Sequence, residues 1–421
     1  MGALSGDCFA HGGGLLTLPE AAALAVRAVH PLDGQERVPL QAARGRVLAE
    51  ALQASHSLPP FTNSAVDGYA FRHADLPGEG AARLLLGGRV MAGQAGAGRL
   101  GPREAFRVLT GAPLPEGADT VLMQEDARIE AGSLLMPPGL ALAIQPGANR
   151  RLAGEDVVSG ALALQQGLRL NPAHLGLAAA LGQGSLPVRR RPRIGVFSTG
   201  EELVPPNGMP GPAQRFDSNR PMLLALLAGL PVEPSDLGIL PDDAAAMAAA
   251  LSDAAATQDL LLTSGGVSGS EADHVRDAIA RSGTVSHWRL AVKPGRPVAM
   301  GVAHGIPVVG LPGNPVAAMV AFLHLARPVI LRLCGARPEE LLRIPARSGF
   351  AHDKRPGRRE FLRVALAPQP DGIPLATAFP RQGSASLASL VASDAFAELP
   401  EDLAAVAPGD VISVLPFAGL F

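Results

Sequence analysis

The chain has 421 residues, which is too long for one ordinary domain and suggests roughly two to four. With 36 basic and 38 acidic residues and a net charge of −2, it gives no argument for a nucleic-acid surface or an anionic membrane, so a small-molecule partner is expected. Apolar residues make up 47% of the chain but aromatic residues only 4%, which predicts cores built from Ala, Leu and Val.

Cysteine usage and the start of the chain favour a cytoplasmic protein. The two cysteines, Cys8 and Cys334, are far apart and lack metal-binding spacing, so no disulfide framework is expected. The first residues contain no basic region followed by an apolar one, so no signal peptide is predicted. No apolar run is expected to span a membrane, because the longest candidates are broken by Pro231, His324 or Arg327.

The first predicted element is an amphipathic helix over residues 17–30. Thr17 is its expected N-cap, Pro19 lies in the first turn, and Glu20 occupies the capping-box position. The segment 38–54 shows apolar alternation without a tight turn and is predicted to be extended connecting chain.

A predicted β module follows. A loop rich in Pro ends at the Asp67-Gly68 turn, which precedes a short strand that carries the only tyrosine of the chain. From residue 84 to 164, short β-type runs alternate with Gly and Pro, which predicts an all-β module. Thr110 lies on one of its turns and Asp156 follows a basic pair. Ordinary turn chemistry is the simpler explanation for Asp67 alone.

After a short predicted helix at 171–182, the pattern becomes strand then helix, repeatedly. The expected strands are 194–200, 232–240 and 259–266, and the expected helices are 217–230 and 241–254. This alternation predicts a parallel sheet flanked by helices, with a ligand site at the carboxyl ends of the strands.

Polar residues gather where these strands end. They are Ser198, Thr199, Gly200, Glu201 and Glu202 after the first strand, Asp217, Ser218, Asn219 and Arg220 before the next helix, and Asp242 and Asp243 after the second strand. Helix N-capping would explain Ser218 or Asn219 alone. The repetition at successive strand ends favours a binding site.

The third strand leads into the stretch 260–279, which is predicted to be strand, loop and helix. Gly265, Gly266 and Gly269 allow close approach of the backbone to a ligand, and the helix that starts near Ser270 directs its positive end there, so an anion is expected. Asp273 and Asp277 share one helical face, which suggests a divalent cation beside a phosphate. The alternative is an ordinary Gly-rich turn with acidic residues that pair with the helix dipole.

Cations cluster in the last part of this region. A predicted β pair brings Arg289, Lys293 and Arg296 to one turn, and Lys293 is one of only two lysines among the 36 basic residues. A long buried-type helix closes the domain. Beyond Arg337, strands and turns predict a small β domain with a basic loop at 354–359 and a small-residue turn at 381–386.

The motifs PPFTNSAVDGYAFR, LTGAPLPEGAD, GEDV, FSTGEEL, DSNR, TSGGVSGSEAD, KPGRP and GLPGNP occur in this order. With them the chain resembles the MoeA-type molybdopterin molybdenumtransferases and the C-terminal domain of gephyrin. The resemblance extends from about Thr17 to the end of the chain. Each motif is weak alone, but the ordered set is specific.

The resemblance implies a multidomain α/β fold: a doubly wound MogA-like domain, a small β module, an extended linker region and a C-terminal β-barrel. The implied divisions are 1–32 for an N-terminal helix on the MogA-like domain, 33–58 with 161–192 for the linker and dimerisation region, 59–160 for the β module, 193–336 for the MogA-like molybdopterin-binding domain, and 337–421 for the barrel. It also implies a homodimer whose active cleft lies at the subunit interface.

The implied reaction inserts molybdate into adenylated molybdopterin, releasing AMP, with Mg²⁺ as cofactor. By family match, the catalytic residues are Asp67, Thr110, Asp273 and Lys293, and the metal ligands are Glu202, Asp242 and Asp273. The implied substrate-binding residues are Asp156, Asp217, Arg220, Gly265, Gly266, Ser268, Arg289, Pro294, Arg296, Arg358 and Ser384. A MogA-like adenylyltransferase and molybdoenzyme-maturation proteins are the candidate protein partners.

Two positions differ from the family pattern, and two alternative functions stay open. Arg289 stands where many relatives have a second lysine, and Ala317 stands where relatives often have serine, so a hydroxyl contact is lost there. One alternative is a molybdopterin adenylyltransferase, because the MogA-like fold also serves that reaction. The other is a gephyrin-like scaffold protein. The lack of a long disordered linker in the sequence argues against this second alternative.

Overall fold

The computed structural model describes residues 14–94, 98–240, 243–266 and 274–420. The chain divides into two compact units. The large unit comprises Met1–Ala49, Gly167–Asn171 and Leu186–Phe421, and the small unit comprises Glu50–Gln166 and Pro172–Ser185. The domain boundaries expected from the sequence are finer than this division and stay predictions.

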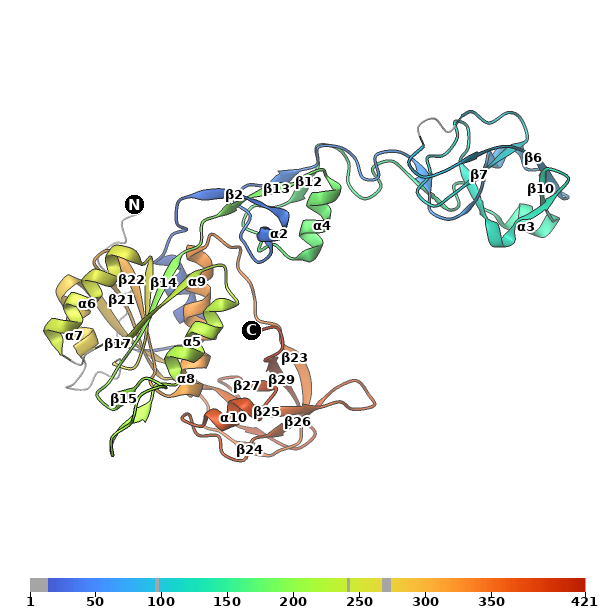
Figure 1. Ribbon diagram of the computed structural model, residues 1–421. Helices are drawn as coiled ribbons and strands as arrows, with labels where there is room; N and C mark the ends of the chain where they lie inside the picture. Colours follow the sequence, from blue (N-terminus) through green and yellow to red (C-terminus); the bar gives the residue numbers. More distant parts are fainter. Residues whose placement is uncertain (1–13, 95–97, 241–242, 267–273, 421) are drawn as a thin grey trace. The chain divides into compact units, whose positions relative to one another are not determined.

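A seven-stranded sheet forms the centre of the large unit, in the order β1-β19-β21-β22-β18-β14-β17 (Figure 1). Its strands are β1 (Leu15–Leu16), β14 (Arg193–Thr199), β17 (Glu233–Leu240), β18 (Leu260–Ser264), β19 (Gly283–Leu290), β21 (Pro297–Ala303) and β22 (Ile306–Leu311). Strands β22, β18, β14 and β17 run parallel to one another, as the strand and helix alternation predicts.

Strand β21 is antiparallel to both of its neighbours, β19 and β22, and its pairing with β19 is the β pair that the sequence predicts. The reason for the antiparallel pairing with β22 is the short connection. Only His304 and Gly305 join β21 to β22, and their φ angles are 48° and 83°. Positive φ at both central positions is the geometry of a two-residue hairpin turn, which connects antiparallel strands.

Helices cover both faces of this sheet (Figure 1). They are α5 (Asn219–Ala228), α6 (Ala244–Thr257), α7 (His274–Ser282), α8 (Pro315–Ala321) and α9 (Arg327–Leu333). Residues of α6 and α7, such as Met247 and Ile279, pack on one face in one buried cluster. Residues of α5, α8 and α9 pack on the other face in a larger cluster with Trp288. The domain is therefore doubly wound, as expected.

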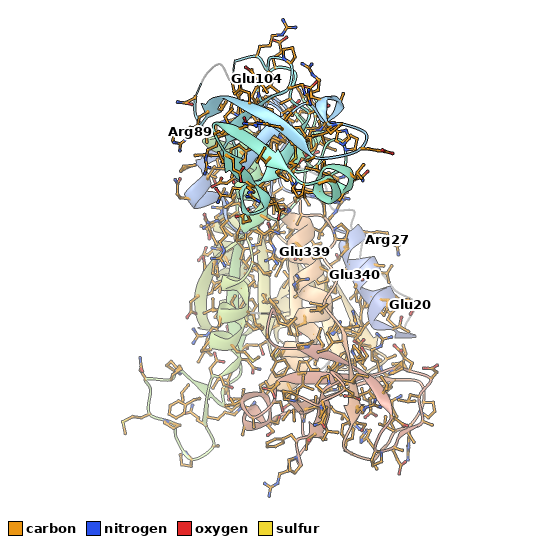
Figure 2. All side chains as sticks on the ribbon, turned by 90° about the vertical axis from the view of Figure 1, so that its right-hand side faces the viewer. Glu20, Arg27, Arg89, Glu104, Glu339 and Glu340 are labelled. Carbon is orange, nitrogen blue, oxygen red and sulfur yellow. The ribbon has the colours of Figure 1, made fainter. Side chains whose placement is uncertain are left out.

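The N-terminal helix α1 (Leu18–Arg27) forms as predicted. Thr17 is the N-cap, and its hydroxyl and the Glu20 carboxylate make both hydrogen bonds of the capping box. Glu20 in the first turn and Arg27 in the last lie toward opposite ends of the helix, where each complements the helix dipole (Figure 2). The helix packs against η3 and α9, and its Ala21 and Ala25 belong to the large buried cluster.

Helices α8 and α9 are joined by a π-helical segment, η3 (Phe322–Ala326), into one helix from Pro315 to Leu333. Its 19 residues are long and apolar enough to cross a membrane by length and composition, so the expectation that no run reaches that length is wrong. The helix continues through Arg327, since arginine is a good helix former, and Arg327 Nη2 pairs with Glu339 Oε2 at 2.7 Å. Within the fold, 78% of the helix is buried, as in a core helix.

The C-terminal region forms a closed five-stranded barrel. Its strands are β23 (Ile344–Ser348), β25 (Arg359–Ala367), β26 (Leu375–Ala378), β27 (Ala395–Leu399) and β29 (Val411–Pro416). The pairing of β25 with β27 closes the barrel. The two-residue strand β20 (Val292–Lys293) of the sheet domain pairs with β25, which ties the barrel to the sheet domain.

The small unit is built on a six-stranded sheet in the order β8-β5-β7-β6-β10-β9. Its strands are β5 (Gly68–Phe71), β6 (Ala82–Val90), β7 (Glu104–Val108), β8 (Thr120–Met123), β9 (Arg128–Glu130) and β10 (Ser133–Met136). Helix α3 (Pro138–Ala143) interrupts the predicted all-β segment, because Pro138 at the first helical position favours a helix start. Helix α4 (Pro172–Ala180) forms where it is predicted.

Short elements complete the fold. In chain order they are β2 (Gln35–Pro39), α2 (Leu40–Ala43), β3 (Leu52–Gln53), β4 (Asn63–Ser64), η1 (His73–Asp75), η2 (Gln124–Asp126), β11 (Arg150–Arg151), β12 (Leu162–Leu164), β13 (Ser185–Arg189), β15 (Leu203–Val204), β16 (Arg215–Phe216), β24 (His352–Asp353), α10 (Leu387–Val391) and β28 (Ala405–Val406). Helix α2 is one turn within the segment that was expected to be extended throughout. Pro39 precedes it, and Leu40, Gln41 and two alanines are good helix formers.

Candidate functional site

Two adjoining cavities lie in the large unit. The larger, here called the basic cleft, has a volume of about 690 Å³ and lies between the sheet domain and the barrel. The smaller, here called the strand-end pocket, has a volume of about 160 Å³ and lies at the carboxyl ends of β14 and β18. The residues that line both cavities are Arg215, Gly265, Gly313 and Asn314. One extended ligand could therefore occupy the two cavities together.

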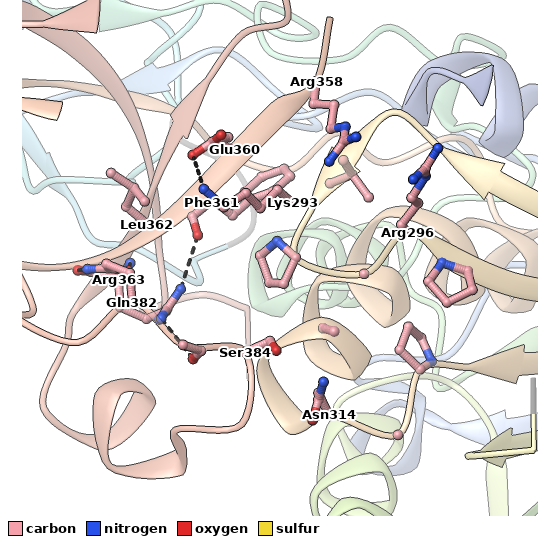
Figure 3. A pocket seen from close by; sticks show the side chains of 18 of the residues that line it. Lys293, Arg296, Asn314, Arg358, Glu360, Phe361, Leu362, Arg363, Gln382 and Ser384 are labelled. Atoms are coloured by element: carbon pink, nitrogen blue, oxygen red, sulfur yellow. Dashed lines mark hydrogen bonds and ion pairs between the residues drawn. The ribbon is translucent and has the colours of Figure 1, made fainter. Parts of the chain in front are cut away.

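Cations from both domains line the basic cleft (Figure 3). Lys293 and Arg296 come from the sheet domain, and Arg358 comes from the barrel. Repulsion by Arg289, then burial, then repulsion by Arg358 lower the pKa of Arg296. The buried Nε of Arg296 has no hydrogen-bond partner among the described residues. This concentration of positive charge suits a small oxyanion.

Lys293 is held by a carboxylate from the barrel (Figure 3). Its Nζ lies 3.2 Å from Oε2 of the buried Glu360, and Nε2 of His352 lies 3.0 Å from the same oxygen. The parallel pairing of β20 with β25 sets this contact, because it places Lys293 opposite Glu360. Sequence reasoning missed Glu360 and His352. The available signal was a single glutamate next to the basic run 354–359.

The barrel loop that carries Arg358 is fixed by the second lysine of the chain. Lys354 is buried, and its Nζ donates to the carbonyls of Pro400 at 2.7 Å and Leu403 at 2.7 Å. A compact ammonium group suits such converging carbonyl oxygens better than a planar guanidinium does. Both lysines therefore occupy positions where a compact cation is held by oxygen atoms.

The strand-end pocket presents polar atoms that lack partners. Asn219 Nδ2 donates to Ser264 Oγ at 2.7 Å and to the Gly313 carbonyl at 2.8 Å. Within the described part of the chain, no partner satisfies Asn219 Oδ1, Ser198 Oγ or Thr199 Oγ1, although all three atoms are buried. An unsatisfied buried polar group costs about 1–3 kcal/mol. A polar ligand would remove this cost.

Two glycines form the turn after β18. Gly265 and Gly266 have φ angles of 96° and 64°, which residues other than glycine rarely adopt. A Cβ on Gly266 would lie 2.6 Å from Val275 Cγ2 and 2.9 Å from Thr199 Cγ2. Gly265 lines both cavities, which agrees with the predicted close approach of the backbone to a ligand. The predicted residues Ser268 and Asp273 lie outside the described residues.

The predicted acidic residues have different surroundings. Glu202 lines the strand-end pocket and lies 3.0 Å from Arg215 Nη2, with both side chains partly exposed. Asp217 is buried in the same pocket, where its Oδ2 accepts from Arg220 Nε at 2.9 Å. Arg220 also pairs with Asp236, so it neutralises two carboxylates and anchors the start of α5. Asp242 falls outside the described ranges.

The described residues include no group of three or more His, Cys, Asp or Glu side chains that could hold a metal ion. Two of the three predicted metal ligands, Asp242 and Asp273, are outside these residues. Glu202 carries a half-exposed carboxylate, paired with Arg215, and lines the same pocket as the hydroxyls of Ser198 and Thr199, which have no partner among the described residues. Such oxygen atoms are the donors that Mg²⁺ prefers, so this part of the pocket fits the metal.

Of the remaining predicted substrate-binding residues, Pro294 and Ser384 line the basic cleft, whereas Arg289 is not among its lining residues. The Ser384 carbonyl accepts from the Val316 N–H at 3.1 Å. Arg289 is exposed on β19 close enough to Arg296 to shift its pKa. Ala317 also lines the cleft, so the position where relatives often carry a serine faces the ligand space.

Three predicted residues belong to the small unit, and two of them are in contact. Asp67 Oδ1 accepts hydrogen bonds from the backbone N–H and the hydroxyl of Thr110, both at 2.8 Å. The backbone bond, then the hydroxyl bond, lower the pKa of Asp67. Asp156 instead pairs with Arg151 at 2.6 Å on the surface.

Three family models match most of the chain. Residues 16–182 match the MoeA N-terminal region (domain I and II), residues 195–332 match a probable molybdopterin binding domain, and residues 345–417 match the MoeA C-terminal region (domain IV). Molybdopterin molybdenumtransferase of Haemophilus influenzae is 35% identical over 406 residues, which cover 96% of this chain and 99% of that protein.

Two further proteins resemble the chain over nearly its whole length. Molybdopterin molybdenumtransferase 2 of Mycobacterium tuberculosis is 36% identical over 403 residues, covering 92% of this chain and 96% of that protein. The crystal structure of the molybdopterin biosynthesis MoeA protein from Pyrococcus horikoshii OT3 has a TM-score of 0.78 and 28% identity, covering 96% of this chain and 100% of that chain.

Proposed function

Because the chain belongs to the MoeA family of molybdopterin molybdenumtransferases, we propose that it forms molybdenum cofactor from molybdate and adenylated molybdopterin and releases AMP. The observation that carries the proposal is the basic cleft, where Lys293, Arg296 and Arg358 converge beside a pocket of partnerless polar atoms. Molybdate is a tetrahedral dianion, so it requires fixed cations and hydroxyls rather than carboxylates.

The two cavities would divide the substrates between them. Lys293, Arg358 and Ser384 would hold molybdate in the basic cleft, with Arg289 and Arg296 adding positive charge. The buried hydroxyls of Ser198 and Thr199, with the Gly265 turn, would bind the polar groups of adenylated molybdopterin in the strand-end pocket. The residues common to both cavities would bring the dithiolene sulfurs next to molybdate.

The chain's residues would act mainly by binding and orientation. Two Mo–S bonds form while one oxygen of molybdate leaves as water with the two thiol protons. A water molecule cleaves the phosphoanhydride, so that AMP leaves and the remaining phosphate stays on the cofactor. The cations of the basic cleft stabilise the negative charge on the oxygens throughout. The Lys293 ammonium, fixed by Glu360, can donate a hydrogen bond to the oxygen that leaves.

Mg²⁺ is the metal that the proposal assigns to the substrate phosphates. Glu202, Asp242 and Asp273 would hold it, and the hydroxyls of Ser198 and Thr199, which line the same pocket as Glu202, fit an oxygen-coordinated cation. When bound, Mg²⁺ would withdraw charge from the phosphoanhydride. Asp217 would contribute indirectly, because its ion pair with Arg220 fixes the helix start that carries Asn219.

The proposed reaction is tested by AMP release from adenylated molybdopterin with Mg²⁺, with and without molybdate. We expect AMP to form only when molybdate is present, because the oxyanion completes the charge balance of the basic cleft. Chromatography of the released nucleotide is the measurement, and sulfate replaces molybdate in the control. If no AMP forms while molybdopterin and ATP give the adenylated product, the protein is an adenylyltransferase instead.

We also propose a cytoplasmic homodimer in which Asp67 and Thr110 of one subunit complete the cleft of the other. A heterodimer of an Asp67→Asn subunit and a Lys293→Ala subunit, isolated with two affinity tags, should then keep about half of the wild-type activity, because one of two symmetric sites is intact. AMP release is the measurement.

A second heterodimer supplies the matched control. It joins a wild-type subunit to a subunit that carries both substitutions, and a shared site predicts that it is inactive because each site then contains one altered residue. If each site instead lies within one subunit, the first heterodimer is expected to be inactive and the second to keep about half of the activity. A monomer or a larger assembly on mass measurement would contradict the dimer, and a lattice-forming state would favour a scaffold role.

A further inference from the structure

Arg363 is a buried arginine beneath the basic cleft, and it has no role in the function proposed above. It lies on β25 with 1% of its surface exposed and contributes to the cleft lining. Its Nε donates to Ser389 Oγ at 3.0 Å, its Nη1 to the Phe361 carbonyl at 3.3 Å, and its Nη2 to the Gly383 carbonyl at 3.0 Å (Figure 3). One planar group thus joins three segments of the barrel.

No described residue that bonds to this guanidinium carries a balancing negative charge. In the part of the chain that the structure describes, all three of its hydrogen-bond acceptors are neutral. Burial lowers the pKa of Arg363 to about 10, so the group still carries its charge at neutral pH. Buried charges in proteins are normally paired, so an unpaired one beside a cleft calls for an anionic ligand.

The backbone of the same residue fixes the neighbouring loop. Arg363 N–H donates to Gln382 Oε1 at 2.9 Å, and Gln382 Nε2 donates to the Arg363 carbonyl at 2.9 Å. Together with the side-chain bond to Gly383, these contacts fasten the segment that leads to Ser384. The position of Ser384 at the cleft therefore depends on Arg363.

We infer that Arg363 is a positioning residue of the oxyanion site, which holds the 382–384 segment in place and leaves a positive charge for the bound oxyanion to balance. This inference rests on the proposed function for the identity of the oxyanion, molybdate. A lysine at this position would keep the charge, but its single ammonium could not reach three acceptors that are spread around a planar group.

The test measures molybdate binding by calorimetry and amide hydrogen exchange of peptides that cover 381–389. R363M is expected to bind molybdate about tenfold more weakly, because the positive charge that the oxyanion balances is lost, and to exchange faster across this segment. R363K should lose less affinity but exchange equally fast. The matched control is R343M, which removes a barrel arginine that pairs with Glu398 and lines neither cavity.

The outcomes separate this inference from the proposed function. Unchanged exchange in R363M and R363K overturns the positioning role, whether or not affinity falls. Molybdate affinity within twofold of the wild type in R363M overturns the role of the charge. If the wild type binds molybdate no better than sulfate while R363M still loosens the segment, the proposed function fails and the positioning role stands. If R363M does not fold, the exchange rates and molybdate affinity of R363K are compared with those of the wild type instead.

Discussion

Replacing Lys293 by alanine is expected to lower molybdate-dependent AMP release by about 10²–10³-fold, the usual effect of removing one charge-stabilising donor from an active site. Lys293 Nζ projects into the basic cleft with 58% of its side chain exposed and is fixed by Glu360 at 3.2 Å. Its removal deletes a cation from the proposed molybdate site and leaves the buried Glu360 with one partner fewer. Initial rates at several molybdate concentrations measure the effect on kcat and on KM.

Two further variants define the role of Lys293. Lys293→Arg keeps the charge but replaces a compact donor with a planar one, so we expect activity between those of the wild type and the alanine variant. Arg332→Gln removes an exposed cation of the same domain that lines neither cavity, and should leave the rate unchanged. An alanine variant that keeps more than about a tenth of the wild-type rate would contradict the assigned role, since such a loss is below the usual effect.

The second large effect concerns stability in acid. His324 lies on η3 with its side chain half-buried and its Nε2 atom buried, and its ring centroid is 4.9 Å from that of Phe361. Burial is the main reason why its pKa falls from 6.5 to about 4, and the arginines 343, 359 and 327 lower it further against the opposing effect of Glu398. The folded protein therefore keeps His324 neutral at a pH where the unfolded chain binds a proton.

The direction in which stability changes with pH follows from this difference in proton binding. The contribution of His324 to stability is fully present above pH 6.5, is lost as pH falls toward 4, and changes little below that. The total loss is roughly 3 kcal/mol of unfolding free energy, because each pKa unit corresponds to about 1.4 kcal/mol. His324→Leu should remove this part of the acid sensitivity.

Urea unfolding at pH 7.5 and pH 4, followed by tryptophan fluorescence, measures the effect. Trp288 is the only tryptophan, and it belongs to the same buried cluster as Phe361. The control variant, His287→Gln, removes an exposed histidine and should keep the wild-type pH dependence. Equal losses of stability between the two pH values in wild type and His324→Leu would show that burial of His324 does not govern acid sensitivity.

Local sequence patterns correctly predicted the helices and strands whose formation depends on residues close together in the chain. The capping box at Thr17, the strand after Gly68 and the alternation of strands and helices from residue 193 were all found as predicted. The errors have local causes as well. Helix α2 forms after Pro39 where extended chain was expected, and α3 begins at Pro138, which favours the first helical position, where only strands were expected.

The candidate site was predictable where its residues carry family motifs or follow strands. Lys293, Arg296, Arg358 and Ser384 do line one cleft. Glu360, His352 and Arg363 were missed because no short pattern distinguishes them from surface residues of a β domain. Their roles come from contacts between segments that are distant along the chain, such as the 67 residues that separate Lys293 from Glu360.

By itself, the sequence determined the family, the order of the elements and the chemical type of the ligand groups, because these depend on residue identity and short-range spacing. The tertiary structure decided which cations share a cleft, which carboxylate restrains Lys293, and which polar atoms are buried without partners. The physical reason is that interaction energies between charges depend on separation and burial. The pairing of β20 with β25 and the closure of the barrel set both quantities.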